Sequence, residues 1–200
     1  MTVRILVLYY SRDGGTAALA RRVAAGVSSV SGVDALLRCV PPVHPTHQAA
    51  TGEAIPDSGP PFAELDDLAS CDGLIIGSPT RFGGMAAPLK LFLERSGALW
   101  LSGALAGKPA AAFTSTGTLH GGQESTLLGM LLPLLHHGML LTGIPYTEAA
   151  LASTQSGGTP YGASHVSGPH GDLPLSSDER DLAAALGRRV AELAQRLQAR

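Results

Sequence analysis

The feature that most constrains the fold of this 200-residue chain is an apolar run close to its start. We predict a strand over residues 3–10, because the β-branched and aliphatic stretch VRILVLYY suits a strand buried on both faces of a parallel sheet. A turn over residues 11–15 follows, and then an amphipathic helix whose apolar positions are Leu19, Val23, Val27 and Val30. A buried strand followed directly by a helix is the order from which parallel sheets are built.

The same alternation continues along the chain. We predict further strands over residues 33–40, 73–77, 109–114 and 139–141, and further helices over residues 62–69, 86–96, 123–137 and from Ser176 onward. Five strands alternating with five helices fit an α/β fold, the flavodoxin-like three-layer sandwich. Its five-stranded parallel sheet has the order 2-1-3-4-5, with helices on both faces. The sequence contains no internal repeat or linker, so we expect a single flavodoxin-like domain over residues 1–200.

Two long segments interrupt this pattern. Residues 41–61 and 143–175 are rich in Gly, Pro, Ser and His and show no periodicity, so we expect loops, and the first of them has no assigned role. The motif Ser176-x-x-Glu179 is a capping box that opens the last helix. The loop histidines His44, His47, His165 and His170 are expected to be solvated.

Composition excludes several classes of partner. The formal net charge is −2 and no basic stripe is visible, so we expect no nucleic-acid partner. The apolar runs are shorter than the roughly 20 residues that cross a bilayer, so we expect a cytoplasmic protein without a membrane span. Cys39 and Cys71 lack metal-ligand spacing, and no metal is expected.

The first informative loop lies between the first strand and the first helix. Ligands of open parallel sheets bind beyond the carboxyl ends of the strands, where residues 11–16 (SRDGGT) would lie. Hydroxyl groups at both ends and free N–H groups at a helix N-terminus can hold a phosphate. The loop lacks the Lys of a nucleotide-hydrolase loop and the spacing of a dinucleotide fingerprint. A mononucleotide phosphate site and an ordinary glycine-rich turn both remain open.

Two further loops follow later strands. Residues 78–85 (SPTRFGGM) could meet a flat heterocycle, with Phe82 as an apolar wall and Arg81 facing an anionic ring or substrate. Residues 114–124 bring four hydroxyl groups and three glycines to one strand end, which permits close approach of the backbone to a ligand. The alternative for residues 78–85 is a plain Pro-Gly loop with a solvated Arg81. The alternative for residues 114–124 is a merely flexible loop.

Together these loops resemble the flavodoxin-like NAD(P)H:quinone oxidoreductases (type IV) of the WrbA family, over nearly the whole chain. The matching motifs, in order, are PTRFG (79–83), STGT (115–118), GGQE (121–124), HHGM (136–139) and GGTPYGA (157–163). Residues 97–105 are similar to an insertion that ordinary flavodoxins lack. The resemblance implies bound FMN, NADH or NADPH as electron donor, a quinone substrate, ping-pong transfer of two electrons and a homotetramer.

The resemblance also implies roles for individual residues. The FMN phosphate would be held by Ser11, Arg12, Asp13, Gly14, Gly15 and Thr16. The flavin ring would lie between two sets, Thr80, Arg81 and Phe82 on one side and Ser115, Thr116, Gly117, Thr118, Leu119 and His120 on the other. His136 would contact the flavin, within the chain or across a subunit boundary, and His136 or His120 would give a proton to the quinone. Trp100 would cover the cavity in which nicotinamide and quinone alternate.

Three departures from the family pattern bear on function. One is Leu119-His120, which stands where some relatives carry glycines or other small residues and would reshape the substrate cavity. Asp13 replaces an aromatic residue associated with dinucleotide binding, so we expect a weaker pyridine-nucleotide site that favours NADH, since a carboxylate repels the 2′-phosphate of NADPH. Gly84 replaces an Asn and removes a side-chain amide. The alternative functions are a flavodoxin-type electron carrier and an FMN-binding protein without efficient turnover. Trp100 has the alternative role of a surface anchor in an oligomer interface.

Overall fold

The computed structural model describes residues 2–43 and 59–198, so His44, His47 and most of the predicted loop at 41–61 lie outside the described residues. Its strands are β1 (Val3–Tyr9), β2 (Val33–Cys39), β3 (Gly73–Arg81), β4 (Gly84–Met85), β5 (Pro109–Thr116), β6 (Leu140–Leu141) and β7 (Ala163–Val166). Its helices are α1 (Gly15–Ser28), α2 (Leu65–Ser70), α3 (Ala87–Glu94), α4 (Gly97–Leu101), α5 (Gln123–His136), α6 (Ala149–Ser153) and α7 (Ser177–Gln198).

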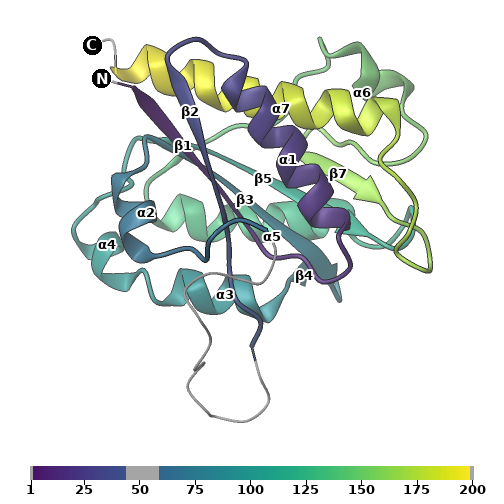
Figure 1. Cartoon of the computed structure of the whole chain (residues 1–200), viewed down its shortest axis with the longest axis horizontal. Coiled ribbons are helices and arrows are strands. Elements are labelled where there is room, and N and C mark those ends of the chain that lie inside the picture. The colour runs from purple at the N-terminus through teal and green to yellow at the C-terminus, as the bar shows by residue number, and fades with distance from the viewer. Residues whose placement is uncertain (1, 44–58, 199–200) are drawn as a thin grey trace.

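The sheet has the order β2-β1-β3-β5-β6, with parallel neighbours throughout (Figure 1). The predicted flavodoxin-like order is confirmed, because β5 and β6 are the fourth and fifth strands of that scheme. β3 extends through Thr80 and Arg81 and forms an antiparallel hairpin with β4. The sequence pattern predicted a loop there, and the hairpin holds this loop at the carboxyl end of the sheet.

β7 lies inside the segment 143–175, which was predicted to be a loop, and that prediction was wrong. β7 pairs with residues 113–116 of β5, whereas β6 pairs only with Pro109 and Ala110. The two short strands therefore share the fifth position of the sheet, with β7 at its carboxyl end. The strand has only four residues, so no periodicity marks it, and its ladder with β5 is a tertiary effect.

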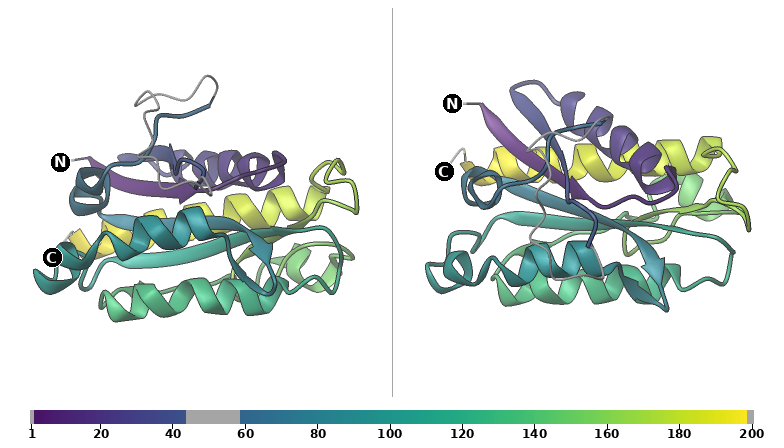
Figure 2. Two further views of the ribbon diagram at one scale, coloured as in Figure 1. Left: turned by 90° about the horizontal axis from the view of Figure 1, so that it is seen from below. Right: turned by 60° about the horizontal axis from the view of Figure 1, so that its bottom comes forward.

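The side chains of β1 alternate between two cores, one on each face of the sheet. Ile5 and Val7 pack with α1 and α7, whereas Leu6 and Leu8 pack with α2, α3 and α5. All four side chains are fully buried, which is the reason for the continuous apolar run in the sequence. Figure 2 shows the resulting three layers, with α1 and α7 on one face and α3 and α5 on the other.

Helices α1 and α7 meet at two glycines. A Cβ on Gly26 would collide with the backbone of Ala184, and a Cβ on Gly187 would collide with the backbone of Val23. The two backbones can approach this closely only because both positions lack a side chain, and the contact fixes α7 against the helix that begins at the first loop. Among the described helices, none is long and apolar enough to cross a bilayer.

Candidate functional site

The turn between β1 and α1 forms an anion cradle. The backbone N–H groups of residues 12–16 donate no hydrogen bond to any described residue, and Gly14 has a φ of 92°. The Ser11 hydroxyl accepts a hydrogen bond from the N–H of Ala17 at 3.3 Å and closes the turn. Five successive free N–H groups at the positive end of a 14-residue helix are suited to a phosphate group.

The three predicted loops meet at this cradle. They line one cavity of about 300 Å³ at the carboxyl edge of the sheet. Of the predicted site residues, the cavity is lined by Ser11, Arg12, Asp13, Gly15, Thr16, Thr80, Arg81, Ser115, Thr116 and Gly117. Its wall does not include Gly14, Phe82, Thr118, Leu119, His120, Trp100 or His136.

A fourth wall, residues 167–171, was missed by the sequence reasoning. The Ser167 N–H and hydroxyl both donate to the carbonyl oxygen of Thr116, at 2.7 and 2.9 Å. A Cβ on Gly171 would lie 3.5 Å from Cβ of Asp13, so this segment reaches the first loop. The segment follows β7 directly, and without β7 no sequence signal places it at the carboxyl edge of the sheet.

The second loop holds a strained and exposed aromatic residue. Phe82 has a φ of 52° and a fully exposed side chain, and it is the one non-glycine residue with positive φ among the described positions. The left-handed conformation is unfavourable for a side chain with a Cβ, and such residues cluster at ligand sites. The neighbouring Arg81 donates to its own loop, from Nη1 to the carbonyl oxygen of Thr80 at 2.7 Å.

The cradle leaves no room for a larger residue at its centre. A Cβ on Gly15 would lie 2.8 Å from the Ser115 hydroxyl oxygen and 3.2 Å from Cδ2 of His165. The hydroxyl groups of Thr16 and Ser115 make no hydrogen bond to a described residue, and both residues line the cavity. Free N–H groups, free hydroxyls and a Cβ-free floor fit the phosphate of a flavin mononucleotide.

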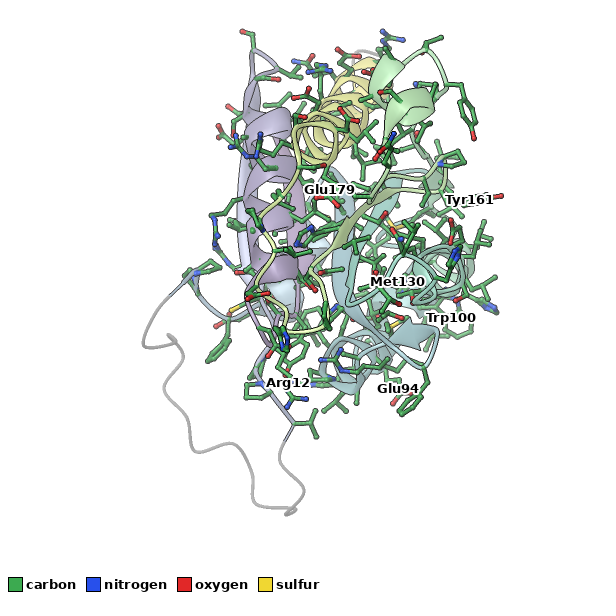
Figure 3. The ribbon with its side chains drawn as sticks, turned by 90° about the vertical axis from the view of Figure 1, so that its right-hand side faces the viewer. Arg12, Glu94, Trp100, Met130, Tyr161 and Glu179 are labelled. Atoms are coloured by element: carbon green, nitrogen blue, oxygen red, sulfur yellow. The ribbon has the colours of Figure 1, made fainter. Side chains whose placement is uncertain are left out.

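Trp100 and His136 come together at a different cavity of about 530 Å³, which also involves His137 and Pro133. Figure 3 shows Trp100 and Arg12 well apart in the molecule. His137 is buried, with Nε2 2.9 Å from the Ser96 hydroxyl oxygen and Nδ1 without a described partner. Burial and the neighbouring His136 lower the pKa of His137. Within one chain, therefore, Trp100 and His136 do not reach the phosphate cradle.

His165 was expected to be solvated, and this expectation was wrong. The side chain is 1% exposed, and its Nδ1 lies 2.9 Å from Oε2 of Glu179, which is equally buried. Pairing of β7 with β5 places His165 beside Ser115 and turns it inward. His170 is exposed, as predicted.

The Glu179 carboxylate accepts four hydrogen bonds. Oε1 accepts from the N–H groups of Gly157 and Val166 at 2.9 and 3.0 Å, and Oε2 accepts from Ser176 N–H at 2.8 Å and from His165. Burial alone raises the pKa of Glu179, but the hydrogen bonds from His165, Val166 and Ser176 outweigh it and lower the pKa to about 2. The predicted capping box is confirmed, because Glu179 N–H donates to the Ser176 hydroxyl at 3.2 Å.

The described residues contain no cluster of three or more His, Cys, Asp or Glu side chains that could hold a metal ion. Cys39 and Cys71 are free thiols. Burial raises the pKa of Cys71 to about 11, so it is not a thiolate at neutral pH.

Comparison with known proteins identifies the family. Residues 3–150 match the family described as NADPH-dependent FMN reductase. The chain belongs to this family. The matched residues include the three predicted loops that line the cavity. The fourth wall at residues 167–171 lies beyond the matched residues, as do β7 and α7.

Two curated relatives align with almost the whole of this chain. A protein of Acidithiobacillus ferrooxidans named NAD(P)H dehydrogenase (quinone) is 45% identical over 196 residues, 97% of this chain and 98% of that protein. A protein of Syntrophobacter fumaroxidans with the same name is 41% identical over 207 aligned residues, 98% of each chain. A solved flavodoxin, WrbA-like protein from Agrobacterium tumefaciens shares the fold, with a TM-score of 0.67, 23% identity and coverage of 98% of this chain and 99% of that one.

Proposed function

We propose that this chain is an FMN-dependent NAD(P)H:quinone oxidoreductase, which transfers two electrons from NADH or NADPH to a quinone and forms a hydroquinone. The observation that carries the proposal is the meeting of three distant loops around five free N–H groups, in a chain 41–45% identical to proteins named NAD(P)H dehydrogenase (quinone). Bound FMN would supply the two-electron redox chemistry, and the protein would supply binding and orientation.

The cradle residues would hold the FMN phosphate. Ser11, Thr16 and Ser115 offer hydroxyl groups, and the free N–H groups of residues 12–16 complete the site. Thr80, Arg81 and Phe82 would flank the flavin ring, and residues 115–120 would lie along its other side. The exposed, left-handed Phe82 would contribute an apolar surface at the mouth of the cavity, which a flat aromatic ring can cover.

A second copy of the chain would complete the site. Trp100 and His136 line a separate cavity, so their predicted roles as roof and proton donor need a neighbouring subunit to bring them to a flavin. Next to them, α5 exposes an apolar stripe, Leu128, Leu132 and Leu135, at the spacing of one helix face. Burial of this stripe between copies would stabilise a homotetramer, and His120 would remain the proton donor contributed by the same chain.

Asp13 bears on the choice of electron donor. Its side chain lines the cavity and is 65% exposed, beside Arg12 at 3.8 Å, so it would meet a dinucleotide that enters from solvent. A carboxylate there disfavours the 2′-phosphate of NADPH, and NADH is the donor that we favour. The free thiols and the nicotinamide donor agree with a cytoplasmic protein.

One reconstitution experiment tests the proposed function. The purified protein is loaded with FMN, NADH is added without oxygen, and benzoquinone follows, while the flavin absorbance is recorded. We expect loss of the absorbance with NADH and full recovery with quinone. Bound flavin that neither NADH nor NADPH bleaches would favour an FMN-binding protein, and stable one-electron reduction would favour an electron carrier.

A pair of glycine variants tests the site. Gly15→Val fills the floor of the cradle and should weaken FMN binding by more than about tenfold. Gly26→Ala collides with α7 instead and should lower stability without changing the FMN Kd. Equal FMN affinity in the wild type and Gly15→Val would refute the cradle as the phosphate site.

A further inference from the structure

One ring nitrogen of His165 is hydrogen-bonded to Glu179, and the other makes no hydrogen bond to a described residue. Glu179 is ionised at neutral pH and acts only as an acceptor, so Nδ1 of His165 carries a proton that it donates to Oε2. Nε2 on the other side of the ring makes no hydrogen bond to any described residue, although the side chain is only 1% exposed. Nε2 is therefore available to a ligand.

The free nitrogen faces the floor of the phosphate cradle. The position that a Cβ would occupy on Gly15 lies 3.6 Å from Nε2 of His165 and 2.8 Å from the Ser115 hydroxyl oxygen. His165 is the register partner of Ser115 in the β5–β7 ladder, so the imidazole and the hydroxyl approach Gly15 together. Gly15 is the first residue of α1, whose N-terminal N–H groups are free.

We propose that His165 is a phosphate-recognition residue of the FMN site, whose imidazolium donates a hydrogen bond from Nε2 to the phosphate and places a positive charge beneath it. Glu179 holds the imidazole by Nδ1 and compensates its charge in the interior. Arg12, which also lines the cavity, is 70% exposed, so His165 supplies a positive charge from within the protein. The inference rests on the proposed FMN site and adds a residue from β7, outside the residues matched by the family.

Other titratable groups also surround this position. Those that face His165 or line the cavity above it are Glu179 from α7, Arg12 and Asp13 from the β1–α1 turn, Arg81 from β3 and His170 from the fourth wall. Arg12 and Asp13 lie 3.8 Å apart and partly neutralise each other in solvent. His165 differs from the groups that line the cavity because it is buried, so solvent screens its interaction with a phosphate least.

Comparison of FMN with riboflavin, which lacks the phosphate, tests the proposal. His165→Gln should raise the Kd for FMN about 10- to 100-fold, the range for loss of a hydrogen bond to a charged group. The Kd for riboflavin should change by less than about twofold. Both values come from quenching of flavin fluorescence. A loss shared equally by FMN and riboflavin, or no loss of FMN affinity, would overturn the proposal.

A matched variant separates phosphate recognition from stability. Ser176→Ala removes the capping hydroxyl that accepts the N–H of Glu179, but it leaves the carboxylate and His165 paired. We expect a lower melting temperature with an unchanged FMN Kd. If Ser176→Ala weakened FMN binding as much as His165→Gln does, the histidine effect would be structural and the proposal would fail.

The wild-type protein separates a failure of this proposal from a failure of the proposed function. A wild-type protein that binds no FMN at all would instead refute the proposed function.

Discussion

Glu179 should make the stability of the fold dependent on pH in acid. Its pKa in the folded protein is lowered from 4.5 to about 2, against the effect of burial, by the hydrogen bonds that it accepts. The unfolded chain regains the ordinary pKa, so between these values the unfolded state binds more protons than the folded state. The stabilisation is therefore fully present above pH 4.5 and is lost as the pH falls through the folded pKa of about 2.

The expected magnitude follows from the same two values. At 1.36 kcal/mol per pH unit, the difference between 4.5 and about 2 corresponds to about 3 kcal/mol of unfolding free energy. This is a large share of the roughly 5–15 kcal/mol by which a domain is stable. Glu179→Gln keeps the size of the side chain but removes the charge and one acceptor. At pH 7 the free energy of unfolding of the variant should be about 3 kcal/mol below that of the wild type. At pH 3 this difference from the wild type should be smaller by about 2 kcal/mol.

Urea denaturation followed by far-UV circular dichroism measures this difference. The titration uses the FMN-free protein at pH 7, 5, 4 and 3, so that release of flavin adds no pH dependence of its own. Glu192→Gln, at a half-buried position of α7 that makes no described hydrogen bond or ion pair, is the control and should show no such trend. A deficit of Glu179→Gln that stays constant from pH 7 to pH 3 would refute the reasoning.

Four further predictions test separate features. Gly187→Ala should lower the free energy of unfolding in urea by about 1–3 kcal/mol, because its Cβ meets the backbone of α1. Gly129→Ala, at a position with open space around it, is the control and should not lower it. Equal effects of the two variants would contradict the glycine contact. Phe82→Gly should gain about 1 kcal/mol of stability and bind FMN more weakly by fluorescence titration; unchanged FMN binding would remove Phe82 from the site. Asp13→Asn should lower the KM for NADPH more than that for NADH in steady-state assays, and an equal effect would argue against charge repulsion. Leu132→Asp should dissociate the proposed homotetramer in sedimentation velocity, and an intact assembly would place the interface elsewhere.

The sequence alone determined the order of the sheet and the position of the cradle. Residues 3–10 are apolar without interruption after Arg4 because β1 is buried on both faces, and this pattern does not depend on distant contacts. The turn at residues 11–16 could be assigned to the carboxyl edge because it follows that strand directly. The capping box at Ser176 and Glu179 could be predicted for the same reason, since both partners lie within one helical turn.

Only the tertiary structure decided the rest of the site. β7 has four residues and exists through its ladder with β5, so the burial of His165 and the wall at residues 167–171 have no local signal. The sequence predicted the role of Glu179 in the capping box. It did not predict the hydrogen bond between Glu179 and His165, which are 14 residues apart in the sequence. The resemblance implied that His136 contacts the flavin and that Trp100 covers the substrate cavity, and the folded chain places both at a cavity separate from the cradle. Sequence patterns report which side chains are buried and where helices begin, and contacts between elements are set by how those elements pack.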